Sequence, residues 1–81
     1  MNEDEIRSAF VEELCRIASD IDPGEVEGRA HLLDDLGLDS MDVLNLVTAL
    51  AKRFEITIPE VEYSQLETPD QAVAYIARKT G

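Results

Sequence analysis

The residues best placed to do chemistry lie in the stretch DLGLDSMD, residues 35–42, where a serine stands among carboxylates directly before an apolar helical run. Asp39 is a suitable N-cap, because its side chain can accept a hydrogen bond from an amide in the first helical turn. Ser40 then takes the first helical position and is not needed as the cap. Its hydroxyl would project from the helix tip, where free amides and the helix dipole stabilise a phosphate. The pattern therefore admits two interpretations: ordinary capping, or a serine that carries a phosphodiester.

Two amphipathic helices are predicted around this serine. Between residues 3 and 19 the apolar residues recur at helical spacing, and acidic residues fill the first turn, where they suit the positive end of the helix dipole. The second helix is predicted from Asp39 or Ser40 to Phe54. Its apolar face follows the helical period and consists of Val43, Leu46, Val47, Leu50 and Phe54.

The remaining segments complete a small helical bundle. Residues 19–31 contain breakers of helical periodicity and are predicted to be a long loop. Residues 55–60 alternate briefly like a strand, but Pro59 and the lack of a partner strand favour a loop into a short helical turn around Glu60 to Ser64. Thr68 as cap, Pro69 at the first helical position and Gln71 three residues after the cap predict a last helix that starts with a capping box. We expect an all-α fold, a small antiparallel bundle of three main helices plus one short helix, in a single domain over residues 1–81.

Composition restricts the partners. Seven basic residues against 18 acidic ones give a net charge of −11, which disfavours nucleic acid and anionic membranes and favours basic docking surfaces or cations. No apolar stretch is long enough for membrane insertion, the first residues do not resemble a signal peptide, and Cys15 has no second cysteine to pair with. A cytoplasmic monomer is expected.

Other candidate sites fail on their own chemistry. The single histidine, His31, has no serine–histidine–aspartate arrangement to join, and Cys15 is interpreted as a packing residue. The acidic loop from Asp20 is not an EF-hand, because Glu25 occupies the sixth position, where that loop requires glycine. We therefore expect no metal site, and a carrier or binding protein rather than an enzyme.

The stretch DDLGLDSMDVLNLV, followed by FEITIP and LETPDQAVAYI, resembles the acyl carrier protein (ACP) family over nearly the whole chain. The family's attachment motif commonly reads Asp-Leu-Gly-x-Asp-Ser-Leu-Asp, and here Met41 stands in place of the last leucine. The resemblance implies a helical bundle that carries 4′-phosphopantetheine on the motif serine, installed from coenzyme A by a phosphopantetheinyl transferase. The arm's thiol carries acyl groups as thioesters between partners such as an acyl-ACP synthetase, a ketosynthase or an acyltransferase.

The same resemblance assigns roles to individual residues. Ser40 corresponds to the attachment site, and Asp39 to the acid that presents it to the transferase. The positions that correspond to partner recognition are Asp39, Met41, Asp42 and Leu44. The residues expected to line the acyl-chain cleft are Leu32, Leu33, Val43, Leu50, Tyr63, Leu66 and Ala72. For each cleft residue the alternative is plain core packing, which any helical bundle needs.

The resemblance implies partner enzymes of fatty acid, lipid or polyketide biosynthesis. Two departures from the family pattern favour a specialised carrier in a dedicated pathway, for a modified lipid, a polyketide or an aminoacyl unit, rather than the housekeeping carrier. After Asp42 the second helix lacks further carboxylates and turns basic at Lys52 and Arg53, whereas fatty-acid carriers usually have several acids there. Tyr63 occupies a position where many members have a small residue. It either shrinks the cleft, which favours a short or polar cargo, or hydrogen-bonds at its rim, and the sequence leaves both open.

Two rival hypotheses remain. A peptidyl or aminoacyl carrier of nonribosomal synthesis shares the serine chemistry and differs in cargo, although strong acidity favours the acyl type. In an unmodified structural interaction domain, Ser40 would be only a capping residue, and the protein would gain no phosphopantetheine from coenzyme A.

Overall fold

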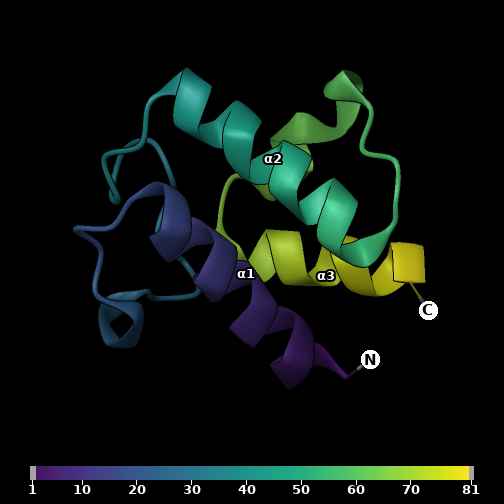
Figure 1. The fold of residues 1–81 in the computed structure, drawn as a ribbon, viewed down its shortest axis with the longest axis horizontal. Coiled ribbons are helices and arrows are strands. Elements are labelled where there is room, and N and C mark those ends of the chain that lie inside the picture. Colours follow the sequence, from purple (N-terminus) through teal and green to yellow (C-terminus); the bar gives the residue numbers. More distant parts are fainter. Residues whose placement is uncertain (1, 81) are drawn as a thin grey trace.

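The computed structural model describes residues 2–80, and within them three α-helices alternate with loops and two short 3₁₀ segments. In chain order these are α1 (Glu3–Ile17), η1 (Pro23–Glu25), α2 (Ser40–Phe54), η2 (Glu60–Leu66) and α3 (Pro69–Thr80). Figure 1 shows α1 running in the opposite direction to α2 and α3, and the backbone of α1 lies against both. Residues 2–80 contain no β-strand, so the predicted all-α bundle is confirmed.

The predicted start of α2 is confirmed in detail. Asp39 is the N-cap, and its Oδ1 accepts a hydrogen bond from the amide of Asp42 at 2.8 Å. The Asp42 carboxylate in turn accepts from the Asp39 amide at 3.3 Å, which completes a capping box. At the other end, Glu55 closes the helix with a left-handed φ of 54°. At the start of α3, the amide of Gln71 donates to Oγ1 of Thr68 at 3.2 Å, so the predicted cap is present there too.

One face of each helix supplies the core, as the helical period predicts. The buried apolar residues of the helices are Ile6, Ala9, Phe10 and Leu14 of α1, Leu46, Val47, Leu50 and Phe54 of α2, and Ala72, Val73, Tyr75 and Ile76 of α3. Leu32, Leu38, Ile58 and Leu66 join this cluster from the connecting segments. Because apolar burial is the main favourable term in folding, this shared cluster holds the helices in place.

The burial of Tyr75 was not indicated by the sequence pattern. Its side chain is 2% exposed, and its hydroxyl donates to the Glu62 carboxylate of η2 at 2.5 Å. Burial, together with this bond, raises the pKa of Tyr75 to about 12. The hydrogen bond from Tyr75 lowers the pKa of Glu62, with Lys79 contributing. The pair therefore ties η2 to α3 with a buried aromatic ring.

The loop before α2 is attached to α3 at Gly28, next to an ion pair that joins α3 to α1. The Asp70 amide donates to the Gly28 carbonyl at 3.0 Å, and a Cβ at Gly28 would lie 2.3 Å from Oδ1 of Asp70. A side chain at Gly28 would push the Asp70 carboxylate out of its present position, and glycine avoids this. The same Asp70 carboxylate pairs with Arg7 of α1 at 2.6 Å. Between residues 18 and 28 the loop contains η1, which the sequence did not predict.

A turn at residues 31–38 then brings the chain to α2. The Leu32 amide donates to the Glu67 carbonyl at 2.9 Å, and the Leu38 amide donates to the Leu32 carbonyl at 3.0 Å. Gly37 has a φ of 74°, a left-handed conformation that glycine adopts without strain. These bonds fix the position from which α2 begins.

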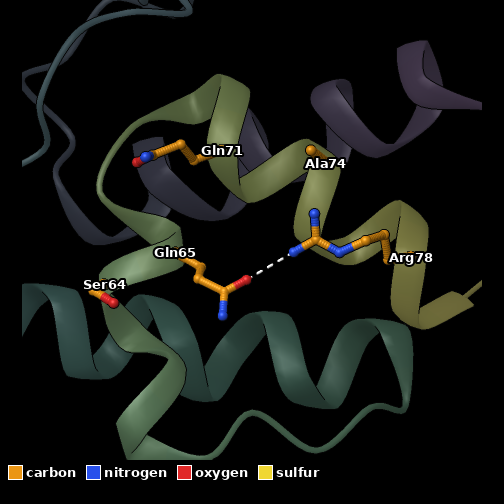
Figure 2. Close-up of a pocket in the computed structure, with 5 residues that line it drawn as sticks. All are labelled: Ser64, Gln65, Gln71, Ala74 and Arg78. Carbon is orange, nitrogen blue, oxygen red and sulfur yellow. Dashed lines mark hydrogen bonds between the residues drawn. The ribbon is translucent and has the colours of Figure 1, made fainter.

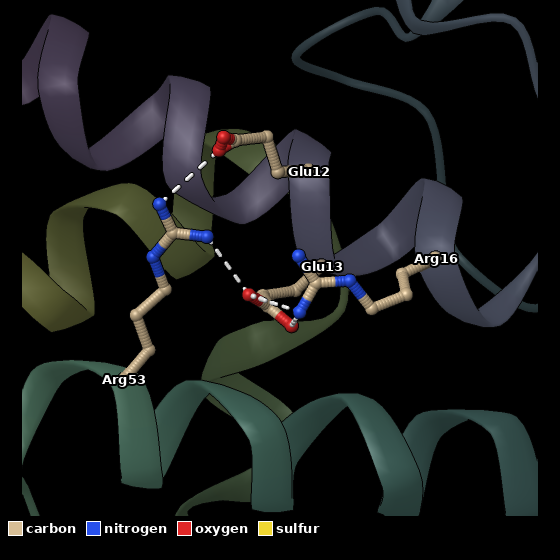
Figure 3. A network of polar contacts seen from close by, with 4 residues as sticks. All are labelled: Glu12, Glu13, Arg16 and Arg53. Atoms are coloured by element: carbon tan, nitrogen blue, oxygen red, sulfur yellow. Dashed lines mark hydrogen bonds and ion pairs between the residues drawn. The ribbon is translucent and has the colours of Figure 1, made fainter.

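A charged network joins α1 to the end of α2, as Figure 3 shows. Glu13 of α1 is 5% exposed, and its carboxylate accepts hydrogen bonds from Arg53 at 2.8 Å and Arg16 at 3.2 Å. Arg53 also pairs with Glu12 at 3.1 Å. The hydrogen bonds from Arg53 to both glutamates raise the pKa of its guanidinium. Much of the basic character predicted for the end of α2 is therefore balanced within the molecule.

Candidate functional site

Ser40 is the first residue of α2 and is exposed. Asp39 supplies the cap, so the serine hydroxyl is not needed for that purpose. In any α-helix the first amides have no carbonyl one turn earlier to bond, and here the Asp42 amide is taken by Asp39. The amides of Ser40 and Met41 remain at the helix tip next to the serine hydroxyl. The position can hold a negatively charged substituent on the serine.

The surface around Ser40 combines carboxylates with apolar side chains. Asp39 is exposed and Asp42 half-exposed, and both carboxylates are held by the capping box. Met41 is 62% exposed and Leu44 is 43% exposed, so two large apolar side chains lie on the surface next to Ser40. All four predicted recognition residues therefore lie at the start of α2, within residues 39–44, and each is at least partly exposed.

A cavity of about 260 Å³ lies beside α2. It brings together residues from the turn before α2, from α2 itself and from η2: His31, Leu32, Leu33, Val43, Tyr63, Ser64, Leu66 and Glu67. Five of these, Leu32, Leu33, Val43, Tyr63 and Leu66, are residues predicted for the cleft. The other two predicted residues, Leu50 and Ala72, do not line this cavity and lie in the closed core at 1% and 0% exposure.

His31 and Glu67 form a polar pair on the cavity lining. Nε2 of His31 lies 2.9 Å from Oε2 of Glu67. The hydrogen bond to Glu67 raises the pKa of His31, and the charges of Asp34, Glu67 and Asp35 act in the same direction. Nδ1 of the ring faces the amides of Leu33 and Asp34 at 3.3 and 3.4 Å. His31 therefore connects the turn before α2 to the segment that precedes α3.

Sequence reasoning missed His31, Ser64 and Glu67 as cavity residues. His31 and Glu67 are 36 residues apart, and no local pattern links them. Ser64 had one available signal, its position next to Tyr63 on the same short helical turn. Pairing across such a distance is a tertiary property that periodicity does not encode.

A second cavity, of about 240 Å³, lies between η2 and α3 and is drawn in Figure 2. Its lining includes Ser64, Gln65, Gln71, Ala74 and Arg78, and the Arg78 guanidinium donates to the Gln65 side chain at 2.7 Å. None of the residues predicted for the cleft lines it. Ser64 contributes to both cavities.

Residues 2–80 contain no cluster of three or more side chains able to hold a metal ion. Burial, with a contribution from Asp22, raises the pKa of the Cys15 thiol, so the reactive thiolate is disfavoured. Within the described part of the chain, no helix has the length and apolarity needed to cross a bilayer.

Comparisons with known proteins identify the family. The family model described as "Phosphopantetheine attachment site" matches residues 4–76. This chain belongs to the acyl carrier protein family. An acyl carrier protein of Campylobacter curvus is 37% identical over 75 residues, which cover 93% of this chain and 91% of that protein. One of Wolinella succinogenes is 38% identical over 73 residues, 90% of each chain.

Two further comparisons concern the fold and the origin of the relatives. A protein from Anaplasma phagocytophilum that is assigned to the acyl carrier proteins is 30% identical, and its solution structure matches this fold with a TM-score of 0.88. The match covers 100% of this chain and 94% of that chain. A relative from Neurospora crassa named as mitochondrial is 36% identical over 76 residues, 94% of this chain and 57% of that protein. The chain is therefore a carrier rather than a catalyst, and its cofactor is 4′-phosphopantetheine. As a family, acyl carrier proteins work with a phosphopantetheinyl transferase and with acyl-handling enzymes.

Proposed function

We propose that Ser40 holds the 4′-phosphopantetheine, and that residues 1–81 form one carrier domain serving a specialised pathway of fatty acid, lipid or polyketide biosynthesis. The observation that carries the assignment is the position of Ser40. It is exposed at the first residue of α2, inside the DLGLDSMD stretch, while the cap is supplied by Asp39.

The residues at the tip of α2 fit a phosphodiester. The amides of Ser40 and Met41 are oriented along the helix axis, and the helix dipole favours negative charge at this end. The carboxylates of Asp39 and Asp42 are each engaged with a backbone amide of the capping box. Their charge is thereby partly compensated, which reduces repulsion toward a phosphate on the neighbouring serine.

When bound, the cofactor supplies a terminal thiol that carries an acyl group as a thioester. The chain's own residues do the rest. Asp39 fixes the start of α2 and so presents Ser40 to the transferase. The cavity lined by Leu32, Val43 and Leu66 can remove apolar carbons from water, at about 0.8 kcal/mol per buried CH₂.

The surface of α2 supports docking of partner enzymes near Ser40. Asp39 and Asp42 attract a basic partner surface, and the exposed side chains of Met41 and Leu44 offer apolar contact area. Further along, Lys52 is exposed, and Arg53 is bound to Glu12 and Glu13. This distribution supports dedicated partner enzymes: an acyl-ACP synthetase, a ketosynthase or an acyltransferase. The basic groups of such a partner would contact only the end of α2 that carries Ser40.

Intact mass tests the attachment site directly. The apo protein is incubated with coenzyme A, Mg²⁺ and a phosphopantetheinyl transferase of broad specificity, and we expect a gain of one phosphopantetheine. Ser40→Ala should gain nothing, while Ser8→Ala, a change at an exposed serine of α1, should gain as much as the parent. An equal gain in Ser40→Ala would refute the assignment.

To identify the cargo and the cellular location, the protein must be purified from its natural source. An acyl thioester recovered from the native protein supports the acyl carrier, and an aminoacyl thioester would support the nonribosomal alternative. A cytoplasmic location is part of the proposal, and one relative is named as mitochondrial, so fractionation of source cells decides the compartment.

A further inference from the structure

The cavity between η2 and α3 is lined by an arginine that binds no carboxylate within residues 2–80. The Arg78 guanidinium donates to the neutral side-chain oxygen of Gln65 at 2.7 Å, as Figure 2 shows. The Glu62 carboxylate on the same short helix is bound by Tyr75 and Lys79 instead. The ion pairs among the described residues involve other cationic side chains: Arg7, Arg16, His31, Arg53 and Lys79. The guanidinium of Arg78 is therefore available to an acidic group of another molecule.

The position of this guanidinium is fixed from two sides. Gln65 holds its Nη2, and the central carbon of the guanidinium lies 5.9 Å from the centre of the Tyr75 ring, a cation–π contact. Tyr75 is itself buried, so the ring provides a rigid support. A side chain that is already ordered loses less conformational entropy when it binds a partner. The bond to Gln65 uses one N–H group, and the planar fork has further N–H groups to donate.

The rest of the lining suits a carboxylate. Ser64 contributes a hydroxyl and Gln71 an amide, and both can donate hydrogen bonds. Ala74 lies between Gln71 and Arg78 on α3, and its small side chain leaves room for a cavity of about 240 Å³ (Figure 2). All these residues are exposed, so the surface of another protein can reach them. The guanidinium fork matches the two oxygens of a carboxylate, which makes an aspartate or glutamate side chain the fitting ligand.

The net charge of the chain decides which carboxylate can bind. At −11 the protein repels free anions, and a single exposed ion pair gives little affinity on its own. A partner enzyme that docks on Asp39 and Asp42 with its basic groups would bring its own carboxylate to Arg78 at a high effective concentration. Ser64 lines both this cavity and the one beside α2, so the two are neighbours on η2. The source of the carboxylate is therefore the partner protein rather than a small ligand.

We propose that Arg78 binds an acidic side chain of the enzymes that use this carrier, while Gln65 holds the guanidinium in position and Ser64 or Gln71 donates a further hydrogen bond. The proposal rests on attachment at Ser40. It adds a contact of opposite charge to the acidic docking surface at the start of α2. Two contacts of opposite sign fix the orientation of the partner, and they disfavour an enzyme whose docking surface is basic throughout.

The test uses the acylated full-length protein as the substrate of a ketosynthase or acyltransferase from the same source that accepts it. Arg78→Gln removes the charge at the cavity. Arg29→Gln changes the net charge equally at an exposed loop residue and is the matched control. We expect Arg78→Gln to raise the KM for the carrier about three- to tenfold with kcat unchanged, the effect of one lost charge-assisted contact. Arg29→Gln should leave KM within about twofold of the parent value.

A purely structural role for Arg78 predicts a different result. If the side chain only ties η2 to α3, Arg78→Gln lowers the melting temperature and leaves KM at the parent value, which would overturn the proposal. An equal change of KM in Arg78→Gln and Arg29→Gln would overturn it as well. Intact mass first confirms that each variant carries phosphopantetheine. A parent protein that does not load refutes attachment at Ser40, whereas normal loading with no effect at Arg78 refutes the contact alone.

A zero-length cross-link identifies the acidic group of the partner. Arg78→Lys places a primary amine at the cavity, and a carbodiimide joins an amine to a carboxylate in contact with it. We expect peptide mapping to show a cross-link from position 78, distinct from any at Lys79, to an aspartate or glutamate of the partner. Arg78→Glu should raise KM, and lysine in place of that partner carboxylate should restore it. Absence of both the cross-link and the restoration contradicts the proposal.

Discussion

Glu13 is a carboxylate that the fold buries at the junction of two helices. It is 5% exposed, whereas the side chains of its partners Arg16 and Arg53 are 72% and 37% exposed. Among the described residues, no buried side-chain polar atom lacks a hydrogen-bond partner. The carboxylate is therefore fully satisfied, and it fixes how the end of α2 lies against α1.

We predict that Glu13→Ala destabilises the protein more than Glu12→Ala does. The first change removes charge-assisted hydrogen bonds of a buried group and leaves a void, at a cost of about 2 kcal/mol. The second removes an exposed pair with the same arginine and should cost less than about 1 kcal/mol. Urea denaturation monitored by circular dichroism measures the free energy of unfolding of both variants. Equal losses of that free energy would contradict this role for Glu13.

His31 predicts a pH dependence of stability. Its contact with Glu67 raises the pKa of the folded state above the ordinary value of 6.5, so protonated His31 favours folding. The stabilisation is complete below 6.5 and is lost as pH rises through the higher folded-state pKa. Thermal melting across this window should show a falling midpoint for the parent and a flatter profile for His31→Gln. Parallel profiles would rule out this contribution.

At the level of single residues, the sequence predicted what is local. Asp39, Ser40 and Asp42 lie within one turn, and the capping rule placed each of them correctly. Glu13 was missed because a carboxylate on an otherwise regular helix is normally exposed, and its partner Arg53 is 40 residues away. No rule of local spacing predicts such a pair.

Some helices were predicted more completely than others, again because sequence rules act on local spacing. α2 has a cap, a clear period and a defined end, so its bounds follow from the sequence alone. η1 is three residues long and has no period to detect. The cavity joins the turn before α2, α2 and η2, so its lining depends on how separate elements pack. That packing places Leu50 and Ala72 in the core and His31 and Glu67 on the cavity.

The ends of α2 allow a paired prediction. Gly37 before the helix and Glu55 after it both have left-handed φ values, 74° and 54°. A side chain in this conformation costs about 1 kcal/mol, which Gly37 avoids and Glu55 does not. Gly37→Ala should therefore lower the unfolding free energy by about 1 kcal/mol, and Glu55→Gly should raise it by up to about 1 kcal/mol. Chemical denaturation that gives the same sign for both would contradict the conformational argument.

For the whole molecule, the net charge of −11 is the dominant electrostatic feature. The described chain measures 30 × 25 × 19 Å, so at low ionic strength, where the screening length is about 30 Å, most carboxylates repel one another across the fold. The ion pairs of Arg7 and Arg53 offset only part of this repulsion.

We predict that sodium chloride stabilises the protein. Raising the ionic strength from about 0.01 to 0.1 M shortens the screening length to about 10 Å and weakens the repulsion. An increase of about 1 kcal/mol in the free energy of unfolding would raise the melting temperature by roughly 4–8 °C for a domain of this size. Differential scanning calorimetry measures it. A midpoint that falls with salt would mean that the ion pairs, rather than the repulsion, control stability.

The contact between Gly28 and Asp70 has a practical consequence for engineering. It fixes one end of the loop that holds η1, and the bond from the Ala18 amide to the Leu14 carbonyl fixes the other. Gly24, at the tip between them, is exposed. Extra residues inserted there lengthen a loop whose ends are already held, and each doubling of loop length costs only about 0.6 kcal/mol. A peptide tag or fluorescent label at the η1 tip could report on the protein while leaving the Ser40 surface unmodified.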